Sequence, residues 1–260
     1  FVINFDWYFF HKVIKYNHLF KDKMQNIYIT GTGFCIPEDG LTTNDEVVDS
    51  YNAYVDNFNL DNVDAISNGS LEALSHSSSE FIEKASGIKT RYLYDKNNCL
   101  DPKRMKPRTR PELPDNTSVL AEMGIESAKN AITNAGIAVD DIDGIILGTS
   151  HSARNYPAIA IEIQEALGVN GYAYDMLVGC SSTTFAISNA YSDIASGLAS
   201  TILVINPELT SPGNDFRIRD SHFIFGDASV ATIVQGNLDN PKDVFQIKDR
   251  ELVTQFSNNI

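Results

Sequence analysis

The chain has 260 residues, of which 43% are hydrophobic, 21% charged and 10% aromatic, and its formal net charge at pH 7 is −14. This composition is typical of a globular protein with a substantial core and excludes a disordered, collagen-like or coiled-coil chain. The acidic balance argues against a nucleic-acid partner or an anionic membrane, since binders of either usually present positive surfaces.

Three cysteines occur, Cys35, Cys99 and Cys180, and none belongs to a Cys-x-x-Cys pair. Three thiols cannot all pair, and no zinc-thiolate spacing is present. We therefore expect neither a disulfide framework nor a metal site. Free cysteines are typical of a reducing compartment, which indicates a cytoplasmic protein.

Residues 1–23 are rich in aromatic side chains and end in lysines, unlike the sequence that follows. They contain no apolar run of the roughly 18 to 20 residues that a membrane-spanning helix needs, and they lack the layout of a signal peptide. Met24 comes directly before a strand-like run. We expect residues 1–23 to be an extension outside the fold, and an amphipathic docking helix is the alternative.

From Met24 onward, short apolar runs alternate with longer amphipathic segments. Asn44 is a predicted N-cap, and glycines follow several helical segments. The pattern predicts strands at 27–29, 91–94, 144–147, 172–177, 201–205, 230–234 and 244–247, and helices at 46–58, 81–86, 116–135, 158–167 and 182–196. Strands separated by helices form β-α-β units, so an α/β fold with a mainly parallel sheet covered on both faces is expected.

The most informative position is Cys180, where the strand that reaches Val178-Gly179 passes into a helix. A helix N-terminus carries unpaired N–H groups and a partial positive charge. Both favour a thiolate, and the same N–H groups can hold the oxyanion formed when a thioester carbonyl is attacked. Cys180 is therefore a candidate nucleophile, and the alternative is the small buried hydrophobic role of most lone cysteines. Cys35 and Cys99 open no helix after a strand and are expected to be structural.

Several short motifs carry a family resemblance: IYITGTG (27–33), SGIKTR (86–91), YPA (156–158), GCSS (179–182) and FIFGDA (223–228). In this order and at these separations they resemble the β-ketoacyl-acyl carrier protein synthase III family, which has the thiolase fold. YNAYV (51–55), SSSEFIEKASGIK (77–89), YPAIAIEIQEALG (156–168), RDSHFIFGDA (219–228) and LVTQFSNN (252–259) are closer still to the family's β-ketodecanoyl synthase branch, which accepts medium-chain acyl groups.

The resemblance implies a mainly parallel five-stranded sheet with helices on both faces, the N-terminal half of an αβαβα sandwich. Residues 24–240 would form this half with the nucleophile Cys180, and 241–260 would begin a truncated C-terminal half. The resemblance also implies that Cys180 takes the acyl group, with its backbone N–H in the oxyanion hole. Substrate-binding positions match as follows: Ser150 and Phe225 line the acyl pocket, Tyr156 enters the pocket of the dimer partner, and Arg219 lies at the coenzyme A site.

The family positions for a Trp and an Arg at the coenzyme A site hold Phe81 and Ala85 here, with Lys84 alongside. The family's active-site His and Asn have no counterpart in this chain. His151 and His222 are expected to be loop or core residues instead. These residues alone are therefore expected to be inactive in condensation.

The implied function is a condensing enzyme of fatty acid biosynthesis. Cys180 takes an acyl group from acyl-CoA, and decarboxylative Claisen condensation with malonyl-acyl carrier protein follows. No metal or other cofactor is implied, and the implied partners are acyl-CoA, acyl carrier protein and a second copy of the chain. The alternatives are a related thiolase-fold acyltransferase, an enzyme like hydroxymethylglutaryl-CoA synthase, and an inactive truncated fragment acting as a binding or dimerising module. The basic loop around residues 103–110 is either a landing patch for an acidic partner or a solvated loop.

Overall fold

The computed structural model describes residues 25–108, 117–239 and 241–258. The expected extension at residues 1–23 lies outside the described residues, and the division at 240/241 stays a prediction. The helices and strands are β1 (Ile27–Cys35), β2 (Leu41–Thr43), α2 (Asn44–Asp61), α3 (Val63–Ser67), α4 (Ser79–Ser86), β3 (Thr90–Tyr92), α5 (Lys96–Cys99), α6 (Val119–Ala135), η1 (Val139–Asp141), β4 (Gly144–Gly148), α7 (Ile159–Leu167), β5 (Tyr172–Met176), η2 (Gly179–Ser181), α8 (Ser182–Ser196), β6 (Thr201–Glu208), η3 (Ser211–Gly213), β7 (Ala228–Gly236) and β8 (Phe245–Gln246).

The main sheet has six strands in the order β5-β4-β6-β7-β1-β8. β4 pairs in parallel with β5 and β6, whereas the β6–β7, β7–β1 and β1–β8 pairs are antiparallel. The strands β5, β4, β6 and β1 therefore run in one direction, and β7 and β8 run in the other. The sheet keeps the expected majority of parallel strands, but it has six strands instead of five. Helices cover both faces, so parallel and antiparallel strands alike carry continuous apolar runs, and the sequence pattern does not distinguish their directions.

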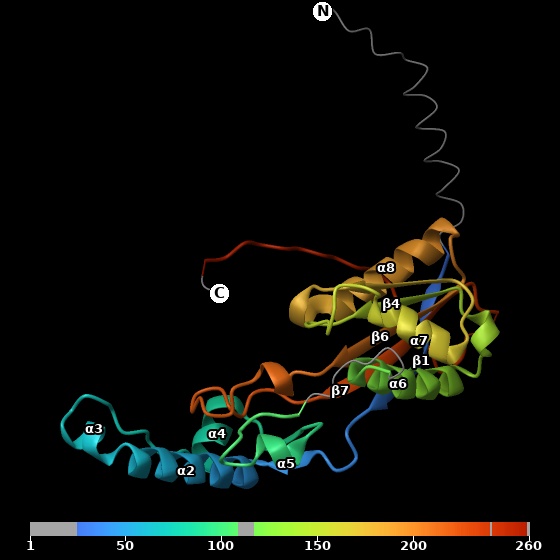
Figure 1. The fold of residues 1–260 in the computed structure, drawn as a ribbon. Coiled ribbons are helices and arrows are strands. Elements are labelled where there is room, and N and C mark those ends of the chain that lie inside the picture. The colour runs from blue at the N-terminus through green and yellow to red at the C-terminus, as the bar shows by residue number, and fades with distance from the viewer. Residues whose placement is uncertain (1–24, 109–116, 240, 259–260) are drawn as a thin grey trace, which may run out of the picture.

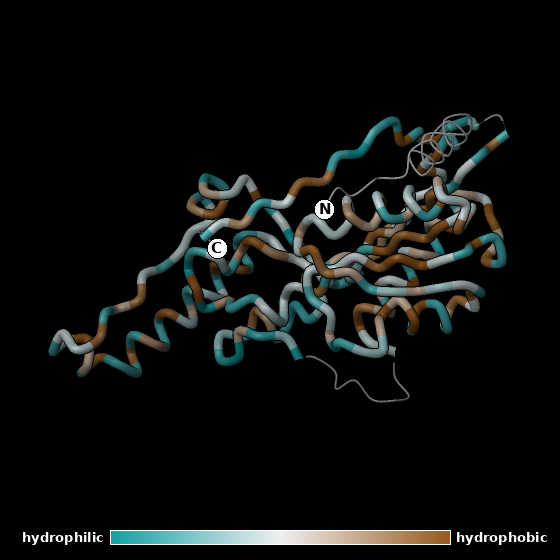
Figure 2. The backbone as a smooth tube through the Cα atoms, turned by 90° about the horizontal axis from the view of Figure 1, so that it is seen from above, coloured by the Kyte–Doolittle hydropathy of each residue, from teal (hydrophilic) through white to brown (hydrophobic). Residues whose placement is uncertain are grey.

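The expected coverage of both sheet faces is confirmed. Helices α6 and α7 pack on one face around a core that includes Leu147, Ile163 and Leu203. Helix α8 packs on the other face around Ile146, Ala190 and Val204. Figure 1 shows α8 above the strands and α6 below them, and in Figure 2 the hydrophobic colour is concentrated in the strands between. Each central strand thus buries both of its faces.

A smaller layer, made of α2, α4 and the β2–β3 pair, extends from one end of the sheet (Figure 1). Thr43, not the predicted Asn44, caps α2, and it forms a capping box with Glu46. The Asn44 side chain instead donates to the Ile88 carbonyl at 2.8 Å and accepts from the Arg91 guanidinium at 2.6 Å. Asn44 therefore fixes the layer internally, while the capping hydroxyl comes from the preceding residue.

Among the described residues, no helix has the length and apolar character needed to cross a bilayer.

Strand β1 lies directly against α6, and Gly33 makes this approach possible. A Cβ at Gly33 would lie 2.2 Å from the Ser127 carbonyl oxygen and 2.4 Å from the Ala131 nitrogen. Both are backbone atoms of a helix, so neither can move aside without shifting the helix. Strand and helix are held at a separation that admits only glycine.

Gly33→Ala should lower the free energy of unfolding by about 3 kcal/mol, because the added methyl group overlaps the α6 backbone. Urea denaturation of the purified chain measures this change. Gly213→Ala is the matched control, since a Cβ there meets nothing within 4 Å. It should stay within about 1 kcal/mol of the parent. Equal stability of the two variants would contradict the close approach.

Candidate active site

Cys180 lies where β5 passes into α8, as the sequence predicts. β5 ends at Met176, Cys180 is the middle residue of the η2 turn, and α8 begins at Ser182. Gly179 has φ of +58°, a left-handed conformation that favours glycine immediately before the cysteine. Cys180 is exposed, which rejects the buried-hydrophobe alternative.

The Ser182 side chain holds this turn in place. Its hydroxyl accepts from the Val178 N–H at 2.9 Å. The hydroxyl proton is shared between the carbonyl oxygens of Gly179, at 2.8 Å, and Thr149, at 3.1 Å. Because Thr149 follows β4, one buried serine ties the nucleophile turn to the end of the neighbouring strand.

Cys180 opens onto a cavity of about 680 Å³. Three of its walls come from the ends of the parallel strands β4, β5 and β6, the edge at which α/β sheets usually bind ligands. The remaining lining includes the first turn of α6 and Phe225. Its residues are Leu120, Ser150, His151, Ser152, Ala153, Gly179, Cys180, Leu209, Thr210, Pro212, Gly213, Asn214 and Phe225. The structure thus brings together Cys180 and two of the four predicted substrate-binding residues, Ser150 and Phe225.

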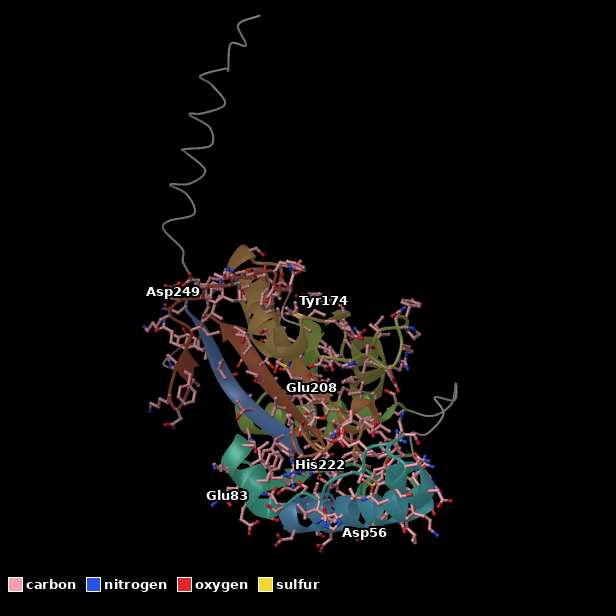
Figure 3. The ribbon with its side chains drawn as sticks, turned by 90° about the vertical axis from the view of Figure 1, so that its left-hand side faces the viewer. Asp56, Glu83, Tyr174, Glu208, His222 and Asp249 are labelled. Carbon is pink, nitrogen blue, oxygen red and sulfur yellow. The ribbon has the colours of Figure 1, made fainter. Side chains whose placement is uncertain are left out.

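Ser150 is fixed by a carboxylate at the end of β6. Glu208 accepts from the Ser150 N–H at 2.7 Å and from the Ser150 hydroxyl at 3.0 Å. Figure 3 labels Glu208 near the centre of the molecule, where the sheet ends. Sequence reasoning missed Glu208, although a charged residue at the end of a buried strand, after the run ILVI, is a signal for such a role.

The other two predicted residues lie outside this cavity. Tyr156 is 82% exposed in the loop between β4 and α7. The Arg219 guanidinium lies 4.2 Å from the centre of the Phe81 ring and donates to the His76 carbonyl at 2.8 Å, so it belongs to the smaller layer. Phe81 occupies one of the positions noted in the sequence as a departure from the family.

Asp227 holds the wall formed by residues 209–213. It is 1% exposed. One carboxylate oxygen accepts from the N–H groups of Thr210, at 2.8 Å, and Ser211, at 2.9 Å. The other oxygen accepts from the Tyr94 N–H at 2.8 Å. This single buried carboxylate therefore joins the cavity wall to the smaller layer. Asp227 belongs to the motif FIFGDA, but its role as a hydrogen-bond acceptor between two loops has no signal in the sequence.

The two central histidines differ. His151 is exposed and lines the Cys180 cavity, so its position is a loop position. His222 is fully buried, with its ring centre 4.7 Å from that of Tyr51 in α2. Figure 3 shows it between the sheet end and α2. Neither ring nitrogen of His222 has a hydrogen-bond partner. Burial, with smaller effects from Arg91 and Arg219, lowers the pKa of His222 to about 4.

The other two cysteines also differ from Cys180. Cys99 is fully buried, and burial raises its thiol pKa to about 12. Cys35 is partly buried, and burial together with Glu126 and Glu38 raises its pKa as well. Within the described ranges, no group of three or more His, Cys, Asp or Glu side chains is placed to hold a metal ion.

Asp227→Asn should lower the free energy of unfolding by about 2 kcal/mol, because an amide presents one acceptor oxygen and leaves a buried N–H group unpaired. Thermal or urea unfolding measures the loss. Asp239→Asn, at an exposed position, removes the same charge and should change stability by less than about 0.5 kcal/mol. An equal loss of stability in both variants would rule out a structural role for the hydrogen bonds that Asp227 accepts.

His222 should make stability depend on pH. Its folded pKa of about 4 lies below the ordinary 6.5, so between these pH values the unfolded chain binds more protons and stability falls as pH falls. Between pH 7 and pH 5 this group contributes a loss of about 2 kcal/mol. His222→Phe removes the titrating group, so the parent should lose about 2 kcal/mol more than the variant in urea titrations. Parallel stability curves would contradict the burial of a neutral imidazole.

Known proteins match this chain in sequence and fold. The family model described as 3-oxoacyl-[acyl-carrier-protein (ACP)] synthase III matches residues 174–250, which include Cys180. The β-ketodecanoyl-[acyl-carrier-protein] synthase of Pseudomonas aeruginosa is 49% identical over 214 residues, which are 82% of this chain and 61% of that protein. The β-ketoacyl-[acyl-carrier-protein] synthase III of Bartonella tribocorum is 34% identical over 66% of this chain and 47% of its own length.

Among solved structures, the 3-oxoacyl-[acyl-carrier-protein] synthase III of Aquifex aeolicus VF5 superposes with a TM-score of 0.60 at 26% identity, over 82% of this chain and 55% of that one. This match confirms the thiolase-like α/β architecture. The chain thus spans between about half and three-fifths of the length of these relatives. By sequence and by fold, it belongs to the 3-oxoacyl-[acyl-carrier-protein] synthase III family, of whose members it covers a part.

Proposed function

We propose that this chain carries the acyl-accepting centre of a condensing enzyme of fatty acid biosynthesis, with Cys180 as the nucleophile. The single observation that supports it most is the position of an exposed cysteine at a strand-to-helix turn that opens onto a largely apolar cavity. The 49% identity to a β-ketodecanoyl synthase supports a medium-chain acyl substrate.

The first half-reaction is acyl transfer. The Cys180 thiolate attacks the thioester carbonyl, and the carbonyl electrons move to oxygen. The Cys180 backbone N–H and the partial positive charge of the α8 N-terminus are proposed to stabilise this oxyanion. The intermediate then collapses, the C–S bond to coenzyme A breaks, and coenzyme A leaves as a thiolate that takes up a proton.

The second half-reaction would belong to the whole protein. Malonyl-acyl carrier protein would lose carbon dioxide, and its carbanion would attack the acyl group on Cys180, which lengthens the chain by two carbons. We propose that the residues of this chain alone support acyl transfer but not this condensation, and that no metal or other cofactor takes part in either step.

Arg219 is proposed to contact the phosphates of coenzyme A. Its guanidinium stacks on Phe81, outside the cavity, and its nearest carboxylate is that of Asp220, at 3.8 Å. A cation that lies over an aromatic ring and makes a long ion pair with an exposed carboxylate can still bind an anionic ligand.

A homodimer is also proposed. Strand β5 is the last strand at its end of the sheet, so among the described residues its outer edge is unpaired. An unpaired edge is suited to pairing with a second copy of the chain. The exposure of Tyr156 supports the expectation that it reaches a partner subunit. Because the net charge is −14, we propose that the chain binds neither nucleic acid nor an anionic membrane. We also propose a cytoplasmic location.

The acylation test uses octanoyl-CoA and peptide mass mapping of the intact chain. Cys180 should gain an octanoyl group at least tenfold faster than Cys99, whose pKa of about 12 leaves almost no thiolate at neutral pH. Cys180→Ser should lose the adduct at that peptide while keeping the unfolding midpoint of the parent. The absence of any adduct at Cys180 would support the alternative of a binding module without chemistry and overturn the proposal.

A further inference from the structure

Three hydroxyl-bearing side chains line the Cys180 cavity: Ser150 and Ser152 in the loop after β4, and Thr210 after β6. All three are half-buried. With His151 and Asn214, they are the polar side chains of a wall that is otherwise formed largely by apolar side chains such as Leu120, Leu209 and Phe225. The direction in which each hydroxyl donates its proton therefore decides whether it can donate a hydrogen bond to a ligand or only accept one.

Each of the three hydroxyls donates its proton to the protein. Ser150 donates to the Glu208 carboxylate at 3.0 Å, Ser152 to the Arg154 carbonyl at 2.6 Å, and Thr210 to the Gly226 carbonyl at 2.7 Å. Carbonyl and ionised carboxylate oxygens accept only, so the hydroxyls are the donors in all three bonds. A hydroxyl has one proton and two lone pairs, and only the lone pairs remain for a ligand.

Two other polar side chains of the lining, Asn214 and His151, can donate as well as accept. Asn214 is buried, and one of its two amide N–H groups points to the His222 carbonyl oxygen at 3.5 Å. A neutral His151 ring offers one donor and one acceptor nitrogen. The N–H groups of Ser181 and Ser182 donate to the Val178 and Gly179 carbonyl oxygens, so the donor proposed for the reacting carbonyl is the Cys180 N–H.

We infer that the Cys180 cavity selects thioesters that carry hydrogen-bond donors near the reacting carbonyl, because its three hydroxyls are acceptors only. This inference rests on the proposed function, since it takes a thioester as the ligand. The shared chemistry is an N–H or O–H group. It can come from the amide of the cysteamine arm on the leaving sulfur or from a hydroxyl group on the acyl chain.

Three small thioesters separate these two sources: S-ethyl octanethioate, which has no donor; the octanoyl thioester of N-acetylcysteamine, which has one amide N–H; and its 3-hydroxyoctanoyl analogue. The rate of Cys180 acylation by each is measured by intact mass and divided by its rate with free cysteine. This division removes differences in intrinsic reactivity. We expect at least one donor-bearing thioester to exceed the donor-free one by about tenfold, the effect of one to two hydrogen bonds.

Variants connect this preference to the hydroxyls. Ser152→Ala and Thr210→Val should each reduce the preference for the donor-bearing thioester about two- to tenfold and leave the rate with S-ethyl octanethioate nearly unchanged. Ser196→Ala is the matched control, because its hydroxyl also donates to a backbone carbonyl, that of Asp193 at 3.0 Å, at the far end of α8. It should keep the full preference.

Labelling by methyl methanethiosulfonate, which carries no hydrogen-bond donor, identifies variants whose turn is disturbed. Variants that keep the parent's labelling rate at Cys180 and its unfolding midpoint retain the site.

A gain with the N-acetylcysteamine thioester supports the inference and assigns the donor to the arm. A gain only with the 3-hydroxyoctanoyl thioester supports it and assigns the donor to the acyl chain. Equal corrected rates for all three thioesters overturn the inference but leave the proposed function standing, whereas no acylation by any thioester overturns both.

Discussion

The buried hydroxyl of Ser182 is the contact on which the site depends. It holds the Val178–Gly179 turn by one accepted hydrogen bond and shares its proton between Gly179 and the end of β4. Gly179 supplies the left-handed backbone that the turn requires. Together they present Cys180 at the surface, beside the first N–H groups of α8, instead of inside the helix.

The cavity walls are held by carboxylates rather than by apolar packing alone. Glu208 fixes the loop after β4, and Asp227 fixes the segment after β6. Both accept backbone N–H groups, which spares those loops the cost of unpaired donors near an apolar space. Glu208 also accepts the Ser150 hydroxyl proton, so one carboxylate contributes both to the stability of the loop after β4 and to the polarity of the cavity. The relatives named above share the fold in which this geometry is built.

The sequence pattern correctly predicted those features that depend on residues close together in the chain. The helix at 182–196 and its end at Gly197 follow from apolar spacing and a left-handed cap, and α8 has those bounds. The position of Cys180 follows from the same pattern. The direction of β7 did not follow from the pattern, because helices cover both faces of the sheet and give β7 the same apolar character as β6, which runs the opposite way. The sequence predicts Asn44 as a helix cap, whereas its side chain accepts a hydrogen bond from the Arg91 guanidinium within the smaller layer. Likewise, the roles of Glu208 and Asp227 depend on partners 58 and 17 residues away in sequence, which spacing alone does not reveal.

The most direct measurement is a crystal structure of the chain after reaction with an octanoyl thioester. The account predicts electron density for an acyl group bonded to the sulfur of Cys180, with its oxygen towards the first turn of α8 and its carbons between Leu120, Leu209 and Phe225. An acyl group attached to another side chain, or an octanoyl chain on Cys180 that extends into solvent away from this cavity, would contradict it.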